Sequence, residues 1–524
     1  MIFRGPYPDV AIPETPLTPF VLHHALEYGD KPALIDGPTG RVITYTGLAQ
    51  SIRCVAASLA ARGFKKGQVL GILSSNLPEY AVMFHGVALL GGVSTLINPL
   101  YTEHEIGHQL QDAGARLLIT GEQFVDKGRA AGQAAHIDEL FVFGEAEGAT
   151  SFASLLENDG EFPAAEINPH EDLVALPYSS GTTGLPKGVM LTHRNLVANL
   201  CQMDGMDYFT GNDTLVCVLP MFHIYGLMVI LNMGLRKGAT IVTMPRFELE
   251  QFLRVVQDHG VTMAHIVPPI VLALSNSPLV AEYDISKLHT IFSGAAPLSD
   301  PLTKVCIERL ACKVRQGYGM TETSPVTHSS PGDPAHVKAG SIGICAPNTE
   351  CKIVDLKTGE PLGRNQEGEL CVRGPQIMKG YLNKPEATAH TVDAEGWLHT
   401  GDVGYADDDG HFFIVDRAKE LIKYKGFQVA PAELEAILLT HSAVADAAVI
   451  PIPDDEAGEI PKAFVVLKGE AAAEEILAFV AVRVAPFKKI RLMEFIDKIP
   501  KSASGKILRR VLVDRDRKAR DTSA

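Results

Sequence analysis

The sequence predicts an α/β fold, with a large N-terminal body of two parallel-rich sheets with helices plus a β-rich subdomain, followed by a small α+β C-terminal domain. Residues 45–120 and 239–267 alternate helical and strand-like hydrophobic patterns, which is typical of parallel sheets. After Gly340 the pattern changes to short β-like runs separated by turns. We expect the domains to be 1–416 and 417–524, which also differ in net charge.

The first alternating stretch begins with a helical pattern that should end near Gly63. Its buried face consists of Leu48, Ile52, Val55, Ala56 and Leu59. Apolar runs predict buried strands at 69–73, 93–97 and 117–120. Between these strands we expect one helix to be capped by Asn76, with Pro78 in its first turn. The next helix should begin with a capping box of Thr102 and Glu105 and end near Gly114.

The second alternating stretch contains a strand-like run at 239–244, a helical pattern at 248–259 and another strand-like run at 261–267. Consecutive strands joined by helices pair in parallel, so this stretch predicts a second parallel region. The β-rich subdomain is indicated by runs at 351–354, 369–372 and 412–415.

The composition excludes several classes of protein. With 524 residues, 46% of them hydrophobic, the chain can bury more than one core, which excludes disorder. A net charge of −15 argues against a nucleic-acid-coating protein, and we expect no nucleic-acid partner. Residues 417–524 nevertheless hold 19 Lys and Arg against 16 Asp and Glu, whereas the remainder holds 28 against 46. This asymmetry suggests that the C-terminal domain handles anionic ligands.

The chain has eight cysteines without any Cys-x-x-Cys spacing, which predicts reduced thiols in a cytoplasmic protein and argues against a zinc ribbon. Residues 80–102 and 214–235 carry no Asp, Glu, Lys or Arg and are long enough to span a bilayer. Each is interrupted by proline and histidine, so we expect buried core and no integral membrane association. The first twenty residues hold several prolines and no continuous apolar run, which argues against a signal peptide.

The most informative segment is YSSGTTGLPKG at 178–188, which follows the apolar run at 173–176. Glycines let backbone N–H groups approach phosphate oxygens, hydroxyls donate further hydrogen bonds, and a lysine supplies positive charge. The spacing does not match a Walker A loop. The segment therefore predicts a phosphate cradle formed by Ser179, Ser180, Gly181, Thr182, Thr183 and Lys187.

This segment resembles the AMP-binding signature of the acyl-adenylate-forming superfamily. Further motifs of that superfamily occur in order, QGYGMTE at 316–322, WLHTGD at 397–402, DRAKELIK at 416–423 and PKSASGK at 500–506. The resemblance runs from about residue 30 to about residue 510 and implies that the C-terminal domain is mobile. Within the superfamily, PMFHIYG at 220–226 and KYKGFQVAPAE at 423–433 resemble 4-coumarate:CoA ligases.

The resemblance implies an ATP-dependent ligase that adenylates a carboxylic acid and then transfers the acyl group to CoA, with Mg²⁺ as the metal ion. The expected substrate is a 4-coumarate-like or cinnamate-like acid. Three alternatives stay open at this point: a medium-chain fatty acyl-CoA synthetase, a luciferase-like oxygenase that uses acyl-AMP, and an adenylation domain that loads a carrier protein. No carrier-protein domain is evident after Arg510, which disfavours the last alternative.

The motifs also imply a role for individual residues. The expected catalytic residues are Lys506, Lys423, Gln428 and His223. Besides the 178–188 segment, the expected nucleotide-binding residues are Ala295, Gln316, Gly317, Thr321, Asp402 and Arg417, with Glu322 as the metal ligand. The expected acyl-binding residues are Tyr225, Val229, Gly294, Pro325, Val326 and Lys419, and the expected CoA-binding residues are Arg246, Lys425 and Gly426.

These roles agree with the chemistry of the side chains. A lysine such as Lys506 can stabilise the negative charge that develops when a carboxylate attacks the α-phosphate. The carboxylate of Asp402 can accept hydrogen bonds from both ribose hydroxyls, and Glu322 offers a hard oxygen for Mg²⁺. By resemblance, Lys419 is the hinge about which the C-terminal domain rotates. This rotation removes Lys506 from the active site and brings the loop at 423–428 there instead.

One departure from the family bears on the substrate. Ligases that accept hydroxycinnamates often carry a small hydroxyl residue four positions after the tyrosine that Tyr225 matches, whereas this chain has Val229. With Met228, Gly294, Pro325 and Val326, this valine predicts a largely apolar pocket. We therefore expect a preference for less hydroxylated acids.

The sequence also contains a match to the zinc-protease signature H-E-x-x-H, HEIGH at 104–108. Glu105 is the expected capping-box partner of Thr102, and Gly107 weakens the helix. We therefore expect this segment to be structural and not a zinc site.

Overall fold

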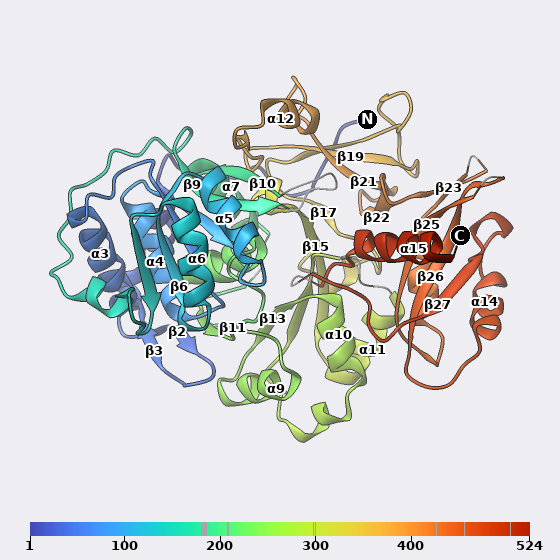
Figure 1. Ribbon diagram of the computed structural model, residues 1–524, viewed down its shortest axis with the longest axis horizontal. Coiled ribbons are helices and arrows are strands. Elements are labelled where there is room, and N and C mark those ends of the chain that lie inside the picture. The colour runs from blue at the N-terminus through green and yellow to red at the C-terminus, as the bar shows by residue number, and fades with distance from the viewer. Residues whose placement is uncertain are drawn as a thin grey trace.

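The computed structural model describes residues 1–523 apart from 180–185, 207–208, 297, 299, 426, 455 and 503–504. Gln428 and residues 521–523 are described by their backbone only. In Figure 1 the blue and green part of the chain forms the left and lower body, the orange part lies at the top, and the red part lies at the right. The chain thus consists of two parallel-rich sheets, an antiparallel sheet and a C-terminal α+β unit.

The first sheet has eight strands in the order β20-β10-β9-β5-β4-β6-β7-β8. Its strands are β4 (Val69–Leu73), β5 (Val93–Ile97), β6 (Ala115–Gly121), β7 (Glu139–Phe143), β8 (Thr150–Ser151), β9 (Leu173–Ser179), β10 (Lys187–Thr192) and β20 (Gly380–Tyr381). The six from β9 to β8 are parallel, whereas β10 and β20 are antiparallel. Its crossover helices are α4 (Pro78–Leu89), α5 (Glu103–Asp112) and α6 (Val125–Ala135). Two further helices, α3 (Tyr45–Ala61) and α7 (His193–Asp204), connect this sheet with the second one.

The second sheet has nine strands in the order β17-β16-β15-β14-β13-β11-β12-β2-β3. Its strands are β2 (Pro32–Asp36), β3 (Val42–Thr44), β11 (Thr214–Cys217), β12 (Thr240–Thr243), β13 (Met263–Ile266), β14 (Thr290–Ser293), β15 (Lys313–Gly319), β16 (Val326–Ser329) and β17 (Ile344–Cys345). Its helices include α8 (Met233–Lys237), α9 (Leu249–Asp258), α10 (Pro268–Asn276) and α11 (Asp300–Leu310). Strands β15 to β2 are parallel, so their carboxyl ends share one edge, where ligands bind in open α/β sheets.

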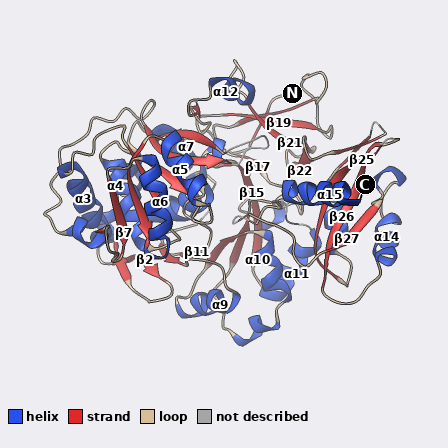
Figure 2. Ribbon diagram, in the orientation of Figure 1, coloured by secondary structure: helices blue, strands red, loops and turns tan. Residues whose placement is uncertain are grey.

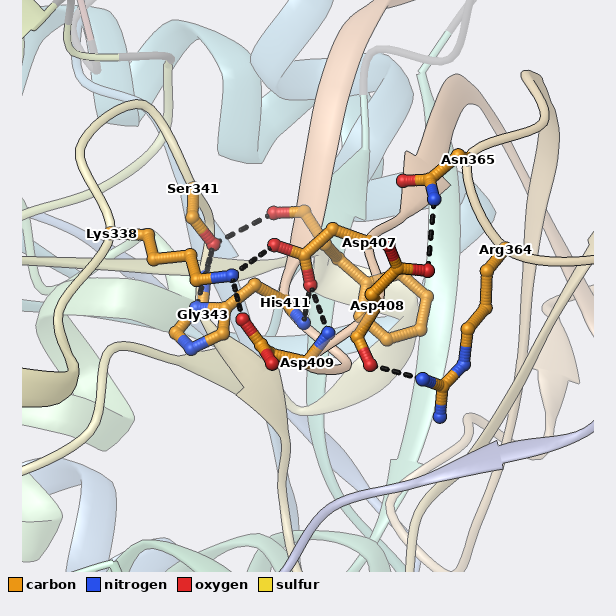
Figure 3. Close-up of polar contacts among 10 residues, drawn as sticks. Lys338, Ser341, Gly343, Arg364, Asn365, Asp407, Asp408, Asp409 and His411 are labelled. Atoms are coloured by element: carbon orange, nitrogen blue, oxygen red, sulfur yellow. Dashed lines mark hydrogen bonds and ion pairs between the residues drawn. The ribbon is translucent and has the colours of Figure 1, made fainter.

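The third sheet is antiparallel, in the order β1-β18-β19-β21-β22, and supplies the predicted β-rich subdomain. Its strands are β1 (Phe3–Arg4), β18 (Glu350–Val354), β19 (Gly368–Arg373), β21 (Leu398–Ala406) and β22 (Phe412–Arg417), and α12 (Pro385–Thr391) precedes β21. Figure 3 shows the β21–β22 turn, where Lys338 bridges Asp407 and Asp409 and the loop residues Arg364 and Asn365 bind Asp408. These contacts tie both neighbouring loops to the turn.

The C-terminal sheet contains β24-β23-β26-β25, with β27 beside β26. Its strands are β23 (Ile422–Tyr424), β24 (Phe427–Val429), β25 (Val444–Asp454), β26 (Gly458–Leu467) and β27 (Leu492–Phe495). Figure 2 shows its helices around the strands: α13 (Pro431–Leu439), α14 (Ala473–Ala481) and α15 (Arg509–Ser523). Two of its hydrophobic clusters, around Ile422 and around Ile450, contain only residues that follow Arg417, whereas one large cluster joins both parallel sheets.

The structure confirms most of the predicted elements. The strands at 69–73 and 93–97 have the predicted bounds, and Thr102 forms both hydrogen bonds of the capping box with Glu105. The prediction that Asn76 caps a helix is wrong. Its buried amide donates to Cys217 O at 3.0 Å and Leu219 O at 2.9 Å, while Asn76 Oδ1 accepts from Met221 N–H at 2.7 Å. Asn76 therefore connects the two parallel sheets instead of capping α4.

The two apolar stretches are divided among buried elements, with α4 and β5 in the first and β11 and α8 in the second. In the part of the chain that the structure describes, every helix is too short or too polar to cross a membrane. The eight cysteines are free thiols, as predicted. The HEIGH segment lies on α5, where His104 and Glu105 are exposed at the capped end of the helix.

Candidate active site

Asp402 lies on β21 and is held by contacts on both carboxylate oxygens. Tyr318 Oη donates to Asp402 Oδ2, and Arg417 Nε lies 3.1 Å from Asp402 Oδ1. Only 4% of Asp402 is exposed. This burial raises the pKa of its carboxyl group, while Arg417, Tyr318 and Lys506 act in the opposite direction. The carboxylate is therefore fixed in one orientation, which is the preorganisation that binding a ribose diol requires.

Glu369 on the neighbouring strand β19 holds the backbone that leads to Asp402. Its Oε1 accepts from Gly401 N–H at 3.0 Å, and its Oε2 lies 2.9 Å from His399 Nδ1. Hydrogen bonds with Cys371 and Glu369 raise the pKa of His399 to about 10, so His399 is an imidazolium at neutral pH. Thr400 Oγ1 accepts from Asp402 N–H at 3.0 Å. The WLHTGD motif thus positions its aspartate through three hydrogen-bonded neighbours.

Lys506 belongs to the C-terminal unit, yet its loop packs against the body of the protein. A Cβ at Gly505 would come within 3.3 Å of Val267 Cγ2 and Pro269 Cγ, so the loop contacts the start of α10. Burial and the positive charge of Arg417 lower the pKa of Lys506, whereas Glu420 and Asp402 raise it. The ammonium group of Lys506 therefore interacts electrostatically with the Asp402–Arg417 pair.

Glu322 lies in the 3₁₀ turn η5 (Thr321–Thr323) and is 4% exposed. Tyr381 Oη donates to Glu322 Oε1 at 2.9 Å, and Lys187 Nζ lies 4.7 Å from the centre of the Tyr381 ring. Lys187, which is expected to bind phosphate, and Glu322, the expected metal ligand, thus both contact Tyr381. Magnesium prefers hard oxygen ligands, so the buried carboxylate of Glu322 fits this ion.

The remaining nucleotide-binding candidates lie at the carboxyl edge of the second sheet. Gln316 is the register partner of Ser293, and its Oε1 accepts from Leu298 N–H at 3.1 Å. Ala295 follows β14 with a φ of +68°, in the left-handed region that is uncommon for alanine. A Cβ at Gly317 would approach Phe292 Cε1 to 2.9 Å, so only glycine fits there. Thr321 is half-buried at the start of η5.

Tyr225 and Gly294 form one wall of the expected acyl site. Tyr225 begins the π-helix η3 (Tyr225–Asn232), and a Cβ at Gly294 would lie 2.8 Å from Tyr225 Cε1. His265 lies beside this wall, stacked on Phe292 at 5.5 Å and edge-on to Tyr225 at 6.2 Å. The other expected lining residues, which are all buried, are Met228, Val229, Pro325 and Val326.

His223 carries the last catalytic role expected within the body. Its Nε2 is buried and has no hydrogen-bond partner among the described residues, and its ring packs on Phe222 at 4.6 Å. Burial lowers the pKa of His223 to about 4, so the imidazole is neutral at pH 7. A neutral ring with an available nitrogen is suited to contact a ligand.

The residues expected to act in CoA transfer lie on the β23–β24 hairpin of the C-terminal unit and on a loop of the body. Lys423 and Gln428 are register partners in the β23–β24 hairpin, and Lys423 N–H donates to Glu459 Oε2 at 2.7 Å. Lys425 forms an ion pair with Glu456. Figure 1 shows β23 at the right, in the C-terminal sheet, where it pairs with β24 and β26. Arg246 and Lys419 are exposed, the former between β12 and α9 and the latter after β22.

Several predicted residues lie outside the described part of the chain. These are Ser180, Gly181, Thr182, Thr183 and Gly426, together with the side chain of Gln428. The segment at 180–185 is flanked by Ser179 and Lys187, which are register partners of β9 and β10.

Sequence reasoning missed Tyr318, Glu369 and Tyr381 as members of this site. Tyr318 lies within the QGYGMTE motif, so its position beside Gly317 was a usable signal. Tyr381 had no such signal, because β20 reaches Glu322 only through its antiparallel pairing with β10. Glu369 likewise approaches Gly401 only through the pairing of β19 with β21.

Comparison with known proteins agrees with this geometry. Residues 21–382 match the family model "AMP-binding enzyme", and residues 433–506 match "AMP-binding enzyme C-terminal domain". The chain is 48% identical to a 4-coumarate–CoA ligase of Pinus taeda, covering 98% of this chain and 97% of that protein. It is 47% identical to 4-coumarate–CoA ligase 1 of Petroselinum crispum, covering 98% and 96%.

Solved structures share the whole arrangement. The anthranilate CoA ligase AuaEII in complex with anthranoyl-AMP superposes with a TM-score of 0.90 at 26% identity, covering 97% of this chain and 99% of that one. A benzoate CoA ligase from Burkholderia xenovorans LB400 superposes with a TM-score of 0.86 at 26% identity, covering 95% and 99%.

Proposed function

The chain belongs to the AMP-binding enzyme family, and from this premise we propose that it is an ATP-dependent carboxylate:CoA ligase acting on a 4-coumarate-like or cinnamate-like acid. ATP and CoA are its co-substrates. The observation that carries the proposal is the position of Lys506, whose charge reaches Asp402 and Arg417 from the C-terminal unit. The lysine proposed to catalyse adenylation, which belongs to the C-terminal unit, is thereby coupled to the carboxylate proposed to bind the ribose.

In the first half-reaction, a carboxylate oxygen of the acid attacks the α-phosphorus of ATP, and pyrophosphate leaves. Negative charge increases on the α-phosphoryl oxygens, and the Lys506 ammonium group is the cation we assign to stabilise it. Asp402 would hold the ribose, because Tyr318 and Arg417 already orient its carboxylate. Alignment of the two reactants by this scaffold accounts for a large part of such rate enhancements.

Glu322 is the residue that would hold Mg²⁺, with Tyr381 orienting its carboxylate. When bound, the ion neutralises part of the triphosphate charge. Lys187, on the opposite side of Tyr381, would add a further positive charge to the cradle.

In the second half-reaction, the CoA sulfur attacks the acyl carbonyl carbon, the thiol proton is lost and AMP leaves. In the present conformation the Lys425 side chain is paired with Glu456, and the backbone N–H of Lys423 donates to Glu459. A different domain position would bring their loop to the acyl-AMP. We propose that the unit 417–524 rotates about Lys419 relative to 1–416 between the two steps. Arg246, Lys425 and Gly426 would then meet CoA.

The acyl pocket supports an aryl substrate. Tyr225, His265 and Phe292 provide flat surfaces, and Val229 and Val326 provide aliphatic ones. We propose that cinnamate and 4-coumarate are preferred over caffeate, since the buried Val229 offers no hydrogen bond to an additional hydroxyl group. The free thiols support the further proposal that the enzyme works in the cytoplasm.

The test is a panel of cinnamic, benzoic and medium-chain fatty acids with ATP, Mg²⁺ and CoA, in which AMP and thioester are both quantified. We expect stoichiometric AMP and thioester with 4-coumarate and cinnamate. A higher kcat/KM for a fatty acid would establish the fatty acyl alternative instead. Absence of acid-dependent AMP across the panel would reject the proposal.

A further inference from the structure

A buried cluster of two thiols and one imidazole lies where the second sheet meets the antiparallel sheet. His328 is on β16, Cys345 on β17 and Cys351 on β18. The imidazole nitrogen and the two sulfurs lie within 4.8 Å of one another, and none of the three residues is more than 1% exposed. Neither the adenylation step nor the thioester step uses these residues.

The separations within the cluster match those of ligands around one metal ion. His328 Nε2 lies 3.6 Å from Cys345 Sγ and 3.4 Å from Cys351 Sγ. In a zinc site, Zn–N is about 2.0 Å and Zn–S about 2.3 Å, so nitrogen and sulfur at the tetrahedral angle lie about 3.5 Å apart. Little movement of the side chains is therefore needed to accept an ion.

The hydrogen bonds around His328 direct a lone pair of the ring toward the thiols. Its Nδ1 lies 2.9 Å from Thr327 Oγ1, and Thr327 Oγ1 donates to Tyr318 O at 3.4 Å. In the tautomer that carries the proton on Nδ1, Nδ1–H donates to the Thr327 hydroxyl oxygen, and the hydroxyl proton is then available to Tyr318 O, so that both contacts are hydrogen bonds. We assign this tautomer from the network, and it leaves Nε2 deprotonated. A hydrogen-bonded second nitrogen is the usual support of a metal-binding histidine.

Two other groups in the chain lack this combination. Glu369, Cys371 and His399 also lie close together, but His399 shares Nδ1 with Glu369 and is protonated, so this nitrogen is not free to bind a metal. Cys306 and Cys312 are a hydrogen-bonded thiol pair without an imidazole. These groups supply matched controls.

We propose that His328, Cys345 and Cys351 form a structural binding site for Zn²⁺. Two thiolates and a neutral imidazole make the complex with a divalent ion electrically neutral, which favours Zn²⁺ over a monovalent ion in a buried site. The site links two sheets. It also supports Tyr318, whose ring lies edge-on to His328 at 5.9 Å and whose hydroxyl group binds Asp402.

The experiment uses the reduced full-length protein, stripped with a chelator, incubated with Zn²⁺ and separated from free ion before elemental analysis. We expect about one equivalent of zinc per chain for the wild type, and loss of most of it in Cys351→Ser and His328→Gln. Cys306→Ser and Cys371→Ser should keep it. Wild-type protein that retains no zinc, or Cys351→Ser and His328→Gln variants that retain as much as the wild type, would overturn the proposal.

Two measurements guard against misfolded variants. Co²⁺ in place of Zn²⁺ should give the intense visible bands and the thiolate charge-transfer band of a tetrahedral site, which Cys371→Ser keeps and Cys351→Ser loses. In the wild type, Zn²⁺ should protect Cys345 and Cys351 from alkylation in mild denaturant while Cys306 and Cys312 react. Equal protection of all four thiols, or of none, would contradict the site without any mutation.

Discussion

Arg417 and Asp402 face each other as register partners on β22 and β21, with Arg417 Nε 3.1 Å from Asp402 Oδ1. Arg417 is also the first residue of the proposed C-terminal domain. The residue that orients the carboxylate proposed to bind the ribose is therefore directly connected to the segment that we expect to move. Lys506 is repelled by Arg417 and attracted by Asp402, so its electrostatic interaction with this pair depends on the position of the lysine.

Lys506→Ala should separate the two half-reactions. The variant loses the cation that we assign to the α-phosphate, so adenylation, measured by acid-dependent ATP–pyrophosphate exchange, should fall roughly 10²- to 10³-fold. Thioester formation from supplied acyl-AMP should change only a few-fold. The control is Lys498→Ala, an exposed lysine of the same C-terminal segment. Equal loss of both half-reactions in Lys506→Ala would contradict the assigned division.

Lys425→Ala should give the opposite pattern. Removing a cation that we assign to the phosphates of CoA should raise the KM for CoA roughly tenfold, while ATP–pyrophosphate exchange stays unchanged. Lys468→Ala, which removes another exposed lysine of the C-terminal unit, is the control. An unchanged KM for CoA in Lys425→Ala would remove this residue from the CoA site.

Tyr318→Phe should weaken nucleotide binding. The substitution removes the hydroxyl group that donates to the buried Asp402 Oδ2 and leaves that oxygen without its donor. We expect the KM for ATP to rise roughly tenfold, which corresponds to about 1.4 kcal/mol. Tyr405→Phe is the control on β21, the strand of Asp402, because Tyr405 pairs with Phe413 and stacks on its ring at 5.1 Å, whereas Asp402 pairs with Arg417. Similar KM values for both variants would count against the assigned role.

Val229→Ser should change the selectivity for hydroxylated acids. The new hydroxyl group follows Tyr225 by four residues on η3 and would offer a hydrogen bond inside an apolar pocket. We expect the ratio of kcat/KM for caffeate over cinnamate to rise roughly tenfold. Val229→Ala controls for the loss of volume, and an equal change in that variant would mean that space, not hydrogen bonding, sets selectivity.

Glu435 should make stability depend on pH. It binds Arg509 at 2.7 and 2.8 Å, and burial, with Asp416 and Glu420 nearby, raises its pKa to about 7 against the opposing effect of Arg509. Between the unfolded pKa of about 4.3 and this folded value the native state binds more protons. The stabilisation from the protonated group is therefore complete below about pH 4 and is lost as the pH rises through about 7.

The free energy of unfolding of the wild type, relative to that of Glu435→Gln, should thus decrease by about 2 kcal/mol between pH 5 and pH 8. Denaturant titration at each pH measures this. Glu494 is the control, because Lys462 and Arg515 overcome the effect of burial and hold its pKa below the usual range. The wild-type free energy relative to Glu494→Gln should accordingly stay flat above pH 5. A flat profile for Glu435→Gln would show that Arg509 keeps Glu435 ionised.

Local sequence patterns were sufficient to predict several strands and one helix cap. The strands at 69–73 and 93–97 and the capping box of Thr102 and Glu105 depend on neighbouring residues, so periodicity and capping chemistry sufficed to predict them. The wrong prediction that Asn76 caps a helix shows the limit of this reasoning. Its side chain donates to the carbonyl groups of Cys217 and Leu219, which lie 141 and 143 residues later, instead of capping the helix.

The sequence by itself determined the family, the order of the elements and the chemical type of each motif residue. Only the tertiary structure decided which partners those residues have. Tyr381 reaches Glu322, Glu369 reaches Gly401, and His328 lies between Cys345 and Cys351. Each of these contacts depends on strand pairing between segments far apart in the chain. Pairing of that kind depends on how whole sheets are buried, and a short segment of sequence does not contain this information.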